Sequence, residues 1–322
     1  MDKLKVVGLT ALGTALVTSS AVAADLSVTG GAKLVLVGGD KQNTGNGWSM
    51  TDSITFSGSA DLDNGWTVST SQNLSAGAAN NAETSINMGD MGTLTFWKSS
   101  GSSAAASWDD MMPAANEESW HGFTSDAQNG NGPLMTAADA NIFKYTVSPM
   151  DGVTINASYN PSAGATAVES SSAAAIQFTG IEGLEVGLAQ GDNNEKIAIT
   201  NEVASHVGKS VENTVFYAKY AIDAITVGVQ ANESDSEMAN ADYDYTGYGI
   251  SYAVTEDMSI SYGVGEIDYQ KAANEDQETT AIGVSYTSGG ITFSGSMHQG
   301  DNLGGTAASD KDAYELNMAF AF

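Results

Sequence analysis

Four carboxylates fall within ten positions in the first half of the chain. They are Asp109, Asp110, Glu117 and Glu118, and the tryptophans Trp108 and Trp120 flank them. In a narrow, wet passage with low-dielectric walls, such carboxylates focus the electric field and raise the local concentration of cations. At the tip of a solvated loop the same residues would have no such role. The elements that hold them therefore decide what they do.

The acidic residues lie in a stretch, residues 99–140, that shows little of the alternation found elsewhere in the chain. A connection of this length is uncommon in a compact fold and is usually functional. Its large apolar side chains are predicted to pack it against a wall rather than to contact a solute. These packing residues are Trp108, Trp120, Met111 and Met112.

Composition excludes several classes of protein. The 322 residues include 39 acidic and 11 basic side chains, all of the latter Lys, for a formal charge of −28. This acidic excess argues against nucleic-acid binding and against adhesion to anionic lipid, because both need a basic surface. An apolar content of 42% and dense strand patterning argue against a disordered acidic chain. Without Cys there is neither a disulfide nor a thiolate metal site.

The first residues have the pattern of a signal peptide. Lys3 and Lys5 precede an apolar run over residues 6–17, and Ala21-Val22-Ala23 forms a small-residue cleavage site. A transmembrane anchor is the alternative, but the run is shorter than the roughly 20 residues that a spanning helix needs. We therefore expect residues 1–23 to be removed and residues 24–322 to form one exported domain.

From residue 25 onward, apolar side chains alternate with small or polar ones, which is the period of a half-buried strand. Sixteen strands are predicted, at residues 25–37, 49–62, 66–73, 83–88, 93–98, 141–148, 153–160, 173–180, 184–190, 213–221, 225–234, 242–253, 258–269, 278–286, 291–300 and 313–322.

The connections between these strands alternate between two kinds. Short ones such as Asp63-Asn64-Gly65 have turn chemistry, and long ones such as residues 74–82 and 191–212 carry most of the acid. Alternation of tight turns with long loops is typical of an outer-membrane barrel. The fold class predicted is all-β, a transmembrane antiparallel β-barrel of about sixteen strands.

The two faces of the strands support this choice. Ile282, Val284 and Tyr286 share one parity, and Ser285 has the other. Because a barrel of sixteen strands is too wide for side chains to fill, the polar face would line an aqueous lumen and the apolar face would meet lipid. A soluble β-sandwich or a surface-layer solenoid is the alternative.

Three lysines have the inward parity, although a one-residue shift of register would turn them outward. They are Lys33, Lys144 and Lys219.

The last strand carries apolar residues of one parity up to the terminal aromatic residue. These are Tyr314, Leu316, Met318, Phe320 and Phe322. This ending, the start Ala24-Asp25-Leu26-Ser27-Val28, the run over residues 88–94 and the acidic run over residues 109–118 together resemble the Gram-negative general porins, most closely those of alphaproteobacterial type.

The resemblance implies a homotrimer of sixteen-stranded barrels in the outer membrane, surrounded by its lipid and passing small hydrophilic solutes and ions. It also implies that the third external loop, here residues 99–140, folds inward and constricts the pore. The terminal strand would be the assembly signal for the barrel-assembly machinery. Family members often place arginines opposite the acidic loop, and this sequence has no Arg. We therefore expect a passive channel that prefers cations.

Other functions have less support in the sequence. A substrate-specific porin and a non-channel surface β-protein with a structural or binding role are the alternatives. The three histidines are scattered and no catalytic, phosphate-binding or zinc motif is present, so no enzyme, cofactor or metal centre is predicted. Acidic outer loops such as residues 235–244 offer oxygen ligands for Ca²⁺ without an ordered pattern, and solvated charge is the favoured interpretation there.

Overall fold

The computed structural model describes residues 25–40, 46–75, 78–99, 101–123, 140–161, 170–193, 210–237 and 241–322. The predicted signal peptide at residues 1–23 lies outside these ranges, and so do residues 124–139 of the predicted constriction loop.

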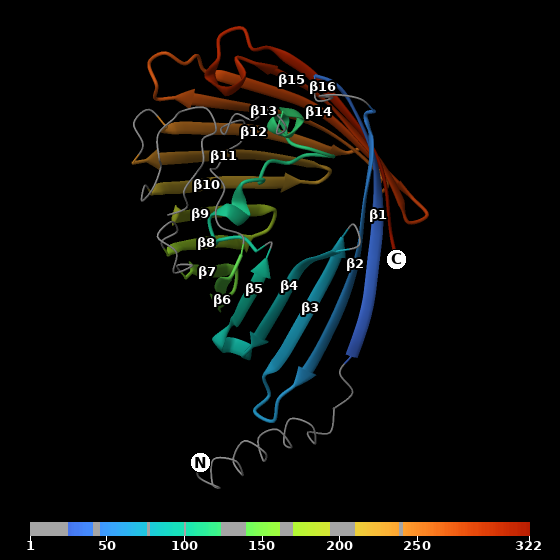
Figure 1. Cartoon of the computed structure of the whole chain (residues 1–322), viewed down its shortest axis with the longest axis vertical. Coiled ribbons are helices and arrows are strands. Elements are labelled where there is room, and N and C mark those ends of the chain that lie inside the picture. Colours follow the sequence, from blue (N-terminus) through green and yellow to red (C-terminus); the bar gives the residue numbers. More distant parts are fainter. Residues whose placement is uncertain are drawn as a thin grey trace.

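Sixteen antiparallel strands close into a barrel, in which β1 pairs with β2 on one side and with β16 on the other. Closure leaves no unpaired edge. The strands are β1 (Asp25–Gly39), β2 (Trp48–Asp61), β3 (Thr67–Ser75), β4 (Ala78–Asn87), β5 (Thr93–Ser99), β6 (Ile142–Met150), β7 (Val153–Asn160), β8 (Ser171–Ile181), β9 (Leu184–Asn193), β10 (Val211–Ile222), β11 (Ile225–Ser236), β12 (Tyr243–Ala253), β13 (Met258–Tyr269), β14 (Gln277–Ser288), β15 (Ile291–Asp301) and β16 (Lys311–Ala321). Figure 1 shows the strands following one another around the wall in chain order.

Side-chain parity gives the barrel an apolar outside and a polar inside. On β14, Ile282 and Val284 are exposed on the outer face, whereas Gln277 and Thr279 are buried on the inner one. The same division holds on β16, where Leu316 and Phe320 face outward and Glu315 is buried inside. The predicted fold class and strand parity are confirmed.

One predicted connection is wrong. Residues 74–82 were expected to form a long loop, but β3 continues to Ser75 and β4 begins at Ala78. Irregular pairing at Asn73/Leu74 and at Ala82/Glu83 interrupts the alternation. Because such bulges shift the side-chain period, an interrupted strand has the sequence pattern of a loop.

In the described part of the chain, four short 3₁₀ helices accompany the strands. They are η1 (Gly89–Met91), η2 (Ala106–Trp108), η3 (Ser119–Phe123) and η4 (Leu303–Gly305). Within the described ranges, no helix is long and apolar enough to cross a membrane. Segment 101–123, which contains η2 and η3, lies on the concave side of the sheet, drawn in teal to green in Figure 1.

The C-terminal residue contributes to barrel closure. Phe322 donates its backbone N–H to Gly30 O at 2.8 Å and accepts from Gly30 N at 2.9 Å. Its ring lies over Gly30, where an added Cβ would come within 2.7 Å of Phe322 Cζ. The terminal residue therefore extends the pairing between β1 and β16 by one more residue pair.

Deleting Phe322 is expected to reduce the yield of folded barrel, because two closing hydrogen bonds, each worth about 0.5–1.5 kcal/mol, are lost together with the ring contact. Heat-modifiable migration of membrane extracts on a gel measures the folded fraction. Phe322→Leu, which keeps the backbone pair and an apolar side chain, is the control. An undiminished folded fraction in the deletion variant would show that closure does not depend on this residue.

Candidate functional site

Segment 101–123 is attached along the inner wall of the barrel from β7 to β15. Among the hydrogen bonds of this attachment, four of 2.8–3.1 Å mark the path of the segment along the wall. They join Ala104 N to Ser158 Oγ, Met111 N to Gln230 Oε1, Ala115 N to Ser261 Oγ and Asn116 Nδ2 to Ser296 Oγ. The wall partners belong to β7, β11, β13 and β15. The segment thus follows the inner wall around more than half of the circumference of the barrel.

Within the described residues, the segment leaves the other side of the wall uncovered. Inward side chains of β2 and β3, such as Thr51, Ser53 and Ser71, are at least partly exposed. By contrast, Gln230, Tyr245 and Thr279 are buried beneath the segment. The uncovered lumen therefore runs between the segment and the strands at the N-terminal end of the chain.

Trp108 anchors the first half of the segment. Its side chain is 7% exposed and packs with Ala175, Ala189 and Val215, while its ring meets Tyr217 edge-on at a centroid distance of 5.0 Å. Met111 packs against the same cluster. A Cβ on Gly187 would lie 2.2 Å from the Tyr217 ring and 2.9 Å from that of Trp108. A glycine at this position is therefore needed for both rings to sit against the wall.

Trp120 anchors the second half. It packs with Tyr243, Tyr245 and Ile267 on β12 and β13. Met112 is also buried, and Phe123 at the end of η3 packs with Leu303 and Ala313. The four predicted packing residues are thus all buried or partly buried in the contact between segment and wall.

Three of the predicted carboxylates lie on the lumen side of the segment. Asp110 is exposed, and Asp109 beside it is partly buried, so that burial and the charge of Asp110 raise the pKa of Asp109 above its usual value. Glu117 accepts from Lys33 Nζ at 3.3 Å and lies 3.5 Å from His121 Nε2. These groups bring negative charge to the narrowed part of the lumen.

Glu118 is placed differently from its neighbour and from the sequence expectation. It is 4% exposed and turns into the segment, where it accepts from Met112 N at 2.6 Å and from Trp120 Nε1 at 2.8 Å. Burial, together with Asp110, raises the pKa of Glu118 to about 9. Because consecutive residues of this irregular loop face opposite ways, the Glu118 carboxyl group lies inside the segment and not in the passage.

The three predicted lysines all lie on the inner face. Lys33 also reaches Glu315 at 3.5 Å, and Lys219 pairs with Glu185 at 3.2 Å. Lys144 lies 6.0 Å above the ring of Trp97, whose Nε1 donates to Glu83 at 2.8 Å. The wall carboxylates were missed in the sequence, although Glu315, Glu185 and Glu83 all have the inward parity.

A histidine and a serine also lie close together at this site. His298 Nε2 lies 2.7 Å from Ser296 Oγ, but both side chains are buried under the segment. Within the described part of the chain no group of three or more His, Asp or Glu could hold a metal ion. Ca²⁺ at the outer loops stays a prediction.

A closed barrel with an apolar exterior, a polar lumen and an inserted acidic segment is the architecture of a membrane channel. Residues 8–322 match the family model described as Gram-negative porin. The chain belongs to the Gram-negative porin family and is an outer-membrane porin. No curated protein matches the sequence at a significant level.

Solved outer-membrane proteins share the fold. A loop-deletion form of OmpT of Vibrio cholerae superimposes with a TM-score of 0.71 at 14% identity, covering 93% of this chain and 100% of the other. An anion-selective porin from Comamonas acidovorans gives 0.67 at 13% identity, with the same coverage. A mutant of the Rh. blastica porin gives 0.63 at 18% identity, covering 92% of this chain and 100% of the other. Family and fold point to a channel rather than to an enzyme.

Proposed function

We propose that the chain is a general diffusion porin, which passes small hydrophilic solutes and ions down their gradients without catalysis and prefers cations. The observation that carries this proposal is segment 101–123, which lies inside a closed barrel and presents Asp109, Asp110 and Glu117 to the lumen. A substrate-specific porin is the alternative within the same class.

The charges of the wall support cation preference. Two of the three inward lysines are each paired with a wall carboxylate, Lys33 with Glu315 and Lys219 with Glu185. The wall thus adds little net positive charge to balance the segment, and the sequence has no Arg to add more. Since the anion-selective Comamonas porin has the same fold at 13% identity, the preference rests on these charges and not on the architecture.

We also propose a homotrimer. On the outer face of β2–β4 the apolar band is interrupted by Asp52, Thr70 and Thr84, all exposed, and by Gln72. A carboxylate facing lipid is costly, whereas a second copy of the chain can supply polar partners. One solved neighbour is an OmpT of Vibrio cholerae described as a trimer form, with a TM-score of 0.68 at 13% identity. Cross-linking in membranes, followed by mass determination, tests this assembly.

Export by the predicted signal peptide and insertion by the barrel-assembly machinery complete the proposal, with outer-membrane lipid around the remaining apolar face. The exposed side chains Ile176, Leu188, Phe216 and Ile250 belong to that face.

Recording in planar bilayers, combined with swelling of vesicles in sugar solutions, tests the proposed function. Stepwise conductance and swelling with solutes of sugar size are expected. A folded, heat-modifiable barrel that gives neither would support a structural or binding role at the cell surface instead.

A further inference from the structure

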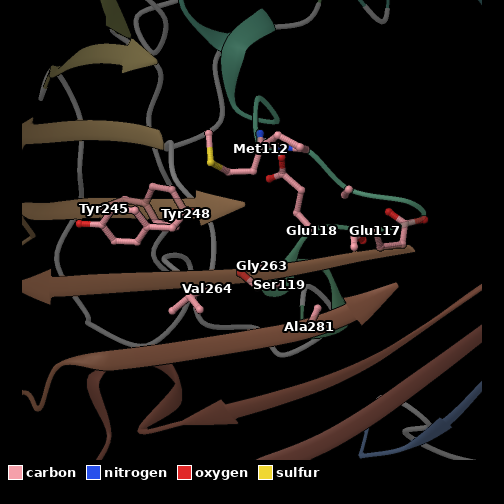
Figure 2. A pocket seen from close by; sticks show the side chains of 12 residues that line it. Met112, Glu117, Glu118, Ser119, Tyr245, Tyr248, Gly263, Val264 and Ala281 are labelled. Atoms are coloured by element: carbon pink, nitrogen blue, oxygen red, sulfur yellow. Dashed lines mark hydrogen bonds between the residues drawn. The ribbon is translucent and has the colours of Figure 1, made fainter. Parts of the chain in front are cut away.

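Glu118 is the most buried carboxyl group of the constricting segment. Figure 2 shows it pointing back toward Met112, while Glu117 points away from it. One carboxyl oxygen accepts from Met112 N and the other from Trp120 Nε1, so Glu118 links η3 to the turn six residues earlier in the chain. Met112 and Trp120 are themselves buried against the wall. The carboxyl group thus joins the two halves of the segment.

A second carboxyl group faces the first. The Asp110 carboxyl group lies close enough to Glu118 for its charge to raise the pKa of Glu118. Two ionised carboxylates side by side repel each other, most strongly where one of them is buried away from water. Burial and the neighbouring charge therefore both favour the protonated form of Glu118.

Most of the titratable groups described around Glu118 are acids. The titratable groups around the pair are Asp109 and Glu117 on the segment, His121 in η3 and Tyr245 on β12. His121 and Lys33 pair with Glu117 instead. Among the described residues, no Lys or His forms an ion pair with Glu118.

We propose that Glu118 is a positioning residue which is protonated at neutral pH, and that loss of its proton at alkaline pH loosens the segment and adds a negative charge to the constriction. Ionisation of Glu118 would place a negative charge in a buried site beside the carboxylate of Asp110. The lost hydration and the repulsion between the two charges would destabilise the docked segment. The inference rests on the proposed channel function but makes its own claim about protonation.

The direction of the pH effect follows from linkage. Burial and Asp110 raise the pKa of Glu118 from 4.5 to about 9. A group that binds its proton more tightly in the folded state makes that state less stable as pH rises between the two values. The contribution of Glu118 to the docked segment is therefore complete below about pH 4.5, falls as the pH rises through neutrality, and is gone above about pH 9.

Infrared difference spectra of the solubilised barrel, recorded between about pH 6 and about pH 10 to bracket this pKa, test the protonation without any channel assay. The parent should lose a protonated-carboxyl band with a midpoint near pH 9. Glu118→Gln should lack the band, and Glu117→Gln, its neighbour in the sequence, should keep it. A parent without the band would overturn the proposal.

Reversal potentials over the same pH range test the functional consequence. The cation-to-anion permeability ratio of the parent and of Glu117→Gln should rise as pH passes the midpoint, and that of Glu118→Gln should not. In Asp110→Asn the rise should occur at lower pH, because the charge that raises the pKa of Glu118 is gone. A rise that persists in Glu118→Gln would contradict the assignment, whereas absence of any conductance with the infrared band intact would count against the proposed function alone.

Discussion

Replacing Trp108 with Ala is expected to release the first half of the constricting segment and to increase single-channel conductance. Truncating a buried tryptophan costs about 3–5 kcal/mol, from lost burial and from the cavity that remains. In this protein the lost free energy weakens the docking of the segment on the wall, because Trp108 packs on Tyr217, Ala189 and Val215 of the wall. The strands pair through their backbones, so the barrel should still close.

Trp48→Ala is the matched control for this variant. Trp48 lies at the start of β2 and is 54% exposed on the outer face, so the same truncation there leaves the lumen unchanged. Single-channel recordings of both variants should show larger and noisier conductance only for Trp108→Ala. Unchanged conductance in a folded Trp108→Ala barrel would mean that the segment does not depend on this anchor.

A lysine at position 284 is expected to reduce the free energy of unfolding by about 2–4 kcal/mol, the cost of a positive charge facing lipid near mid-bilayer. Val284 is 41% exposed on the outer face of β14, between Ile282 and Tyr286. Equilibrium unfolding in lipid vesicles with denaturant measures the change.

Ser285→Lys places the same charge one residue further along β14, on the lumen face. It should cost little, because the side chain meets water there. Ser285 pairs with Ser259 and Ser294 on the neighbouring strands and has the same parity as the buried Gln277 and Thr279, so its row faces inward. Equal destabilisation by the two lysines would show that the register of the sheet is wrong.

Most of the fold could be predicted from the sequence because a strand in a membrane barrel repeats one simple rule, apolar outward and polar inward, over its whole length. That rule placed Lys33, Lys144 and Lys219 in the lumen. It failed at residues 74–82, where irregular pairing interrupts the alternation of β3 and β4. Strand parity carries no information across such an irregularity.

The site was less predictable, because segment 101–123 has no period. The sequence identified Trp108 and Trp120 as anchors by their size, but Glu117 and Glu118 looked alike. Their opposite orientations follow from contacts with Lys33, 84 residues away, and with Met112 and Trp120 inside the segment. Pairing of Lys33 with Glu315, 282 residues apart, is likewise set by barrel closure.

The reversal potential of single channels in a salt gradient tests the central claim most directly. The parent should prefer cations, more strongly at low salt, since the screening length falls from about 10 Å at 0.1 M to about 3 Å at 1 M. The triple variant Asp109→Asn, Asp110→Asn and Glu117→Gln should lose most of this preference while its barrel stays folded. A parent that prefers anions, or a reversal potential that does not change in the triple variant, would show that segment 101–123 is not the charge filter.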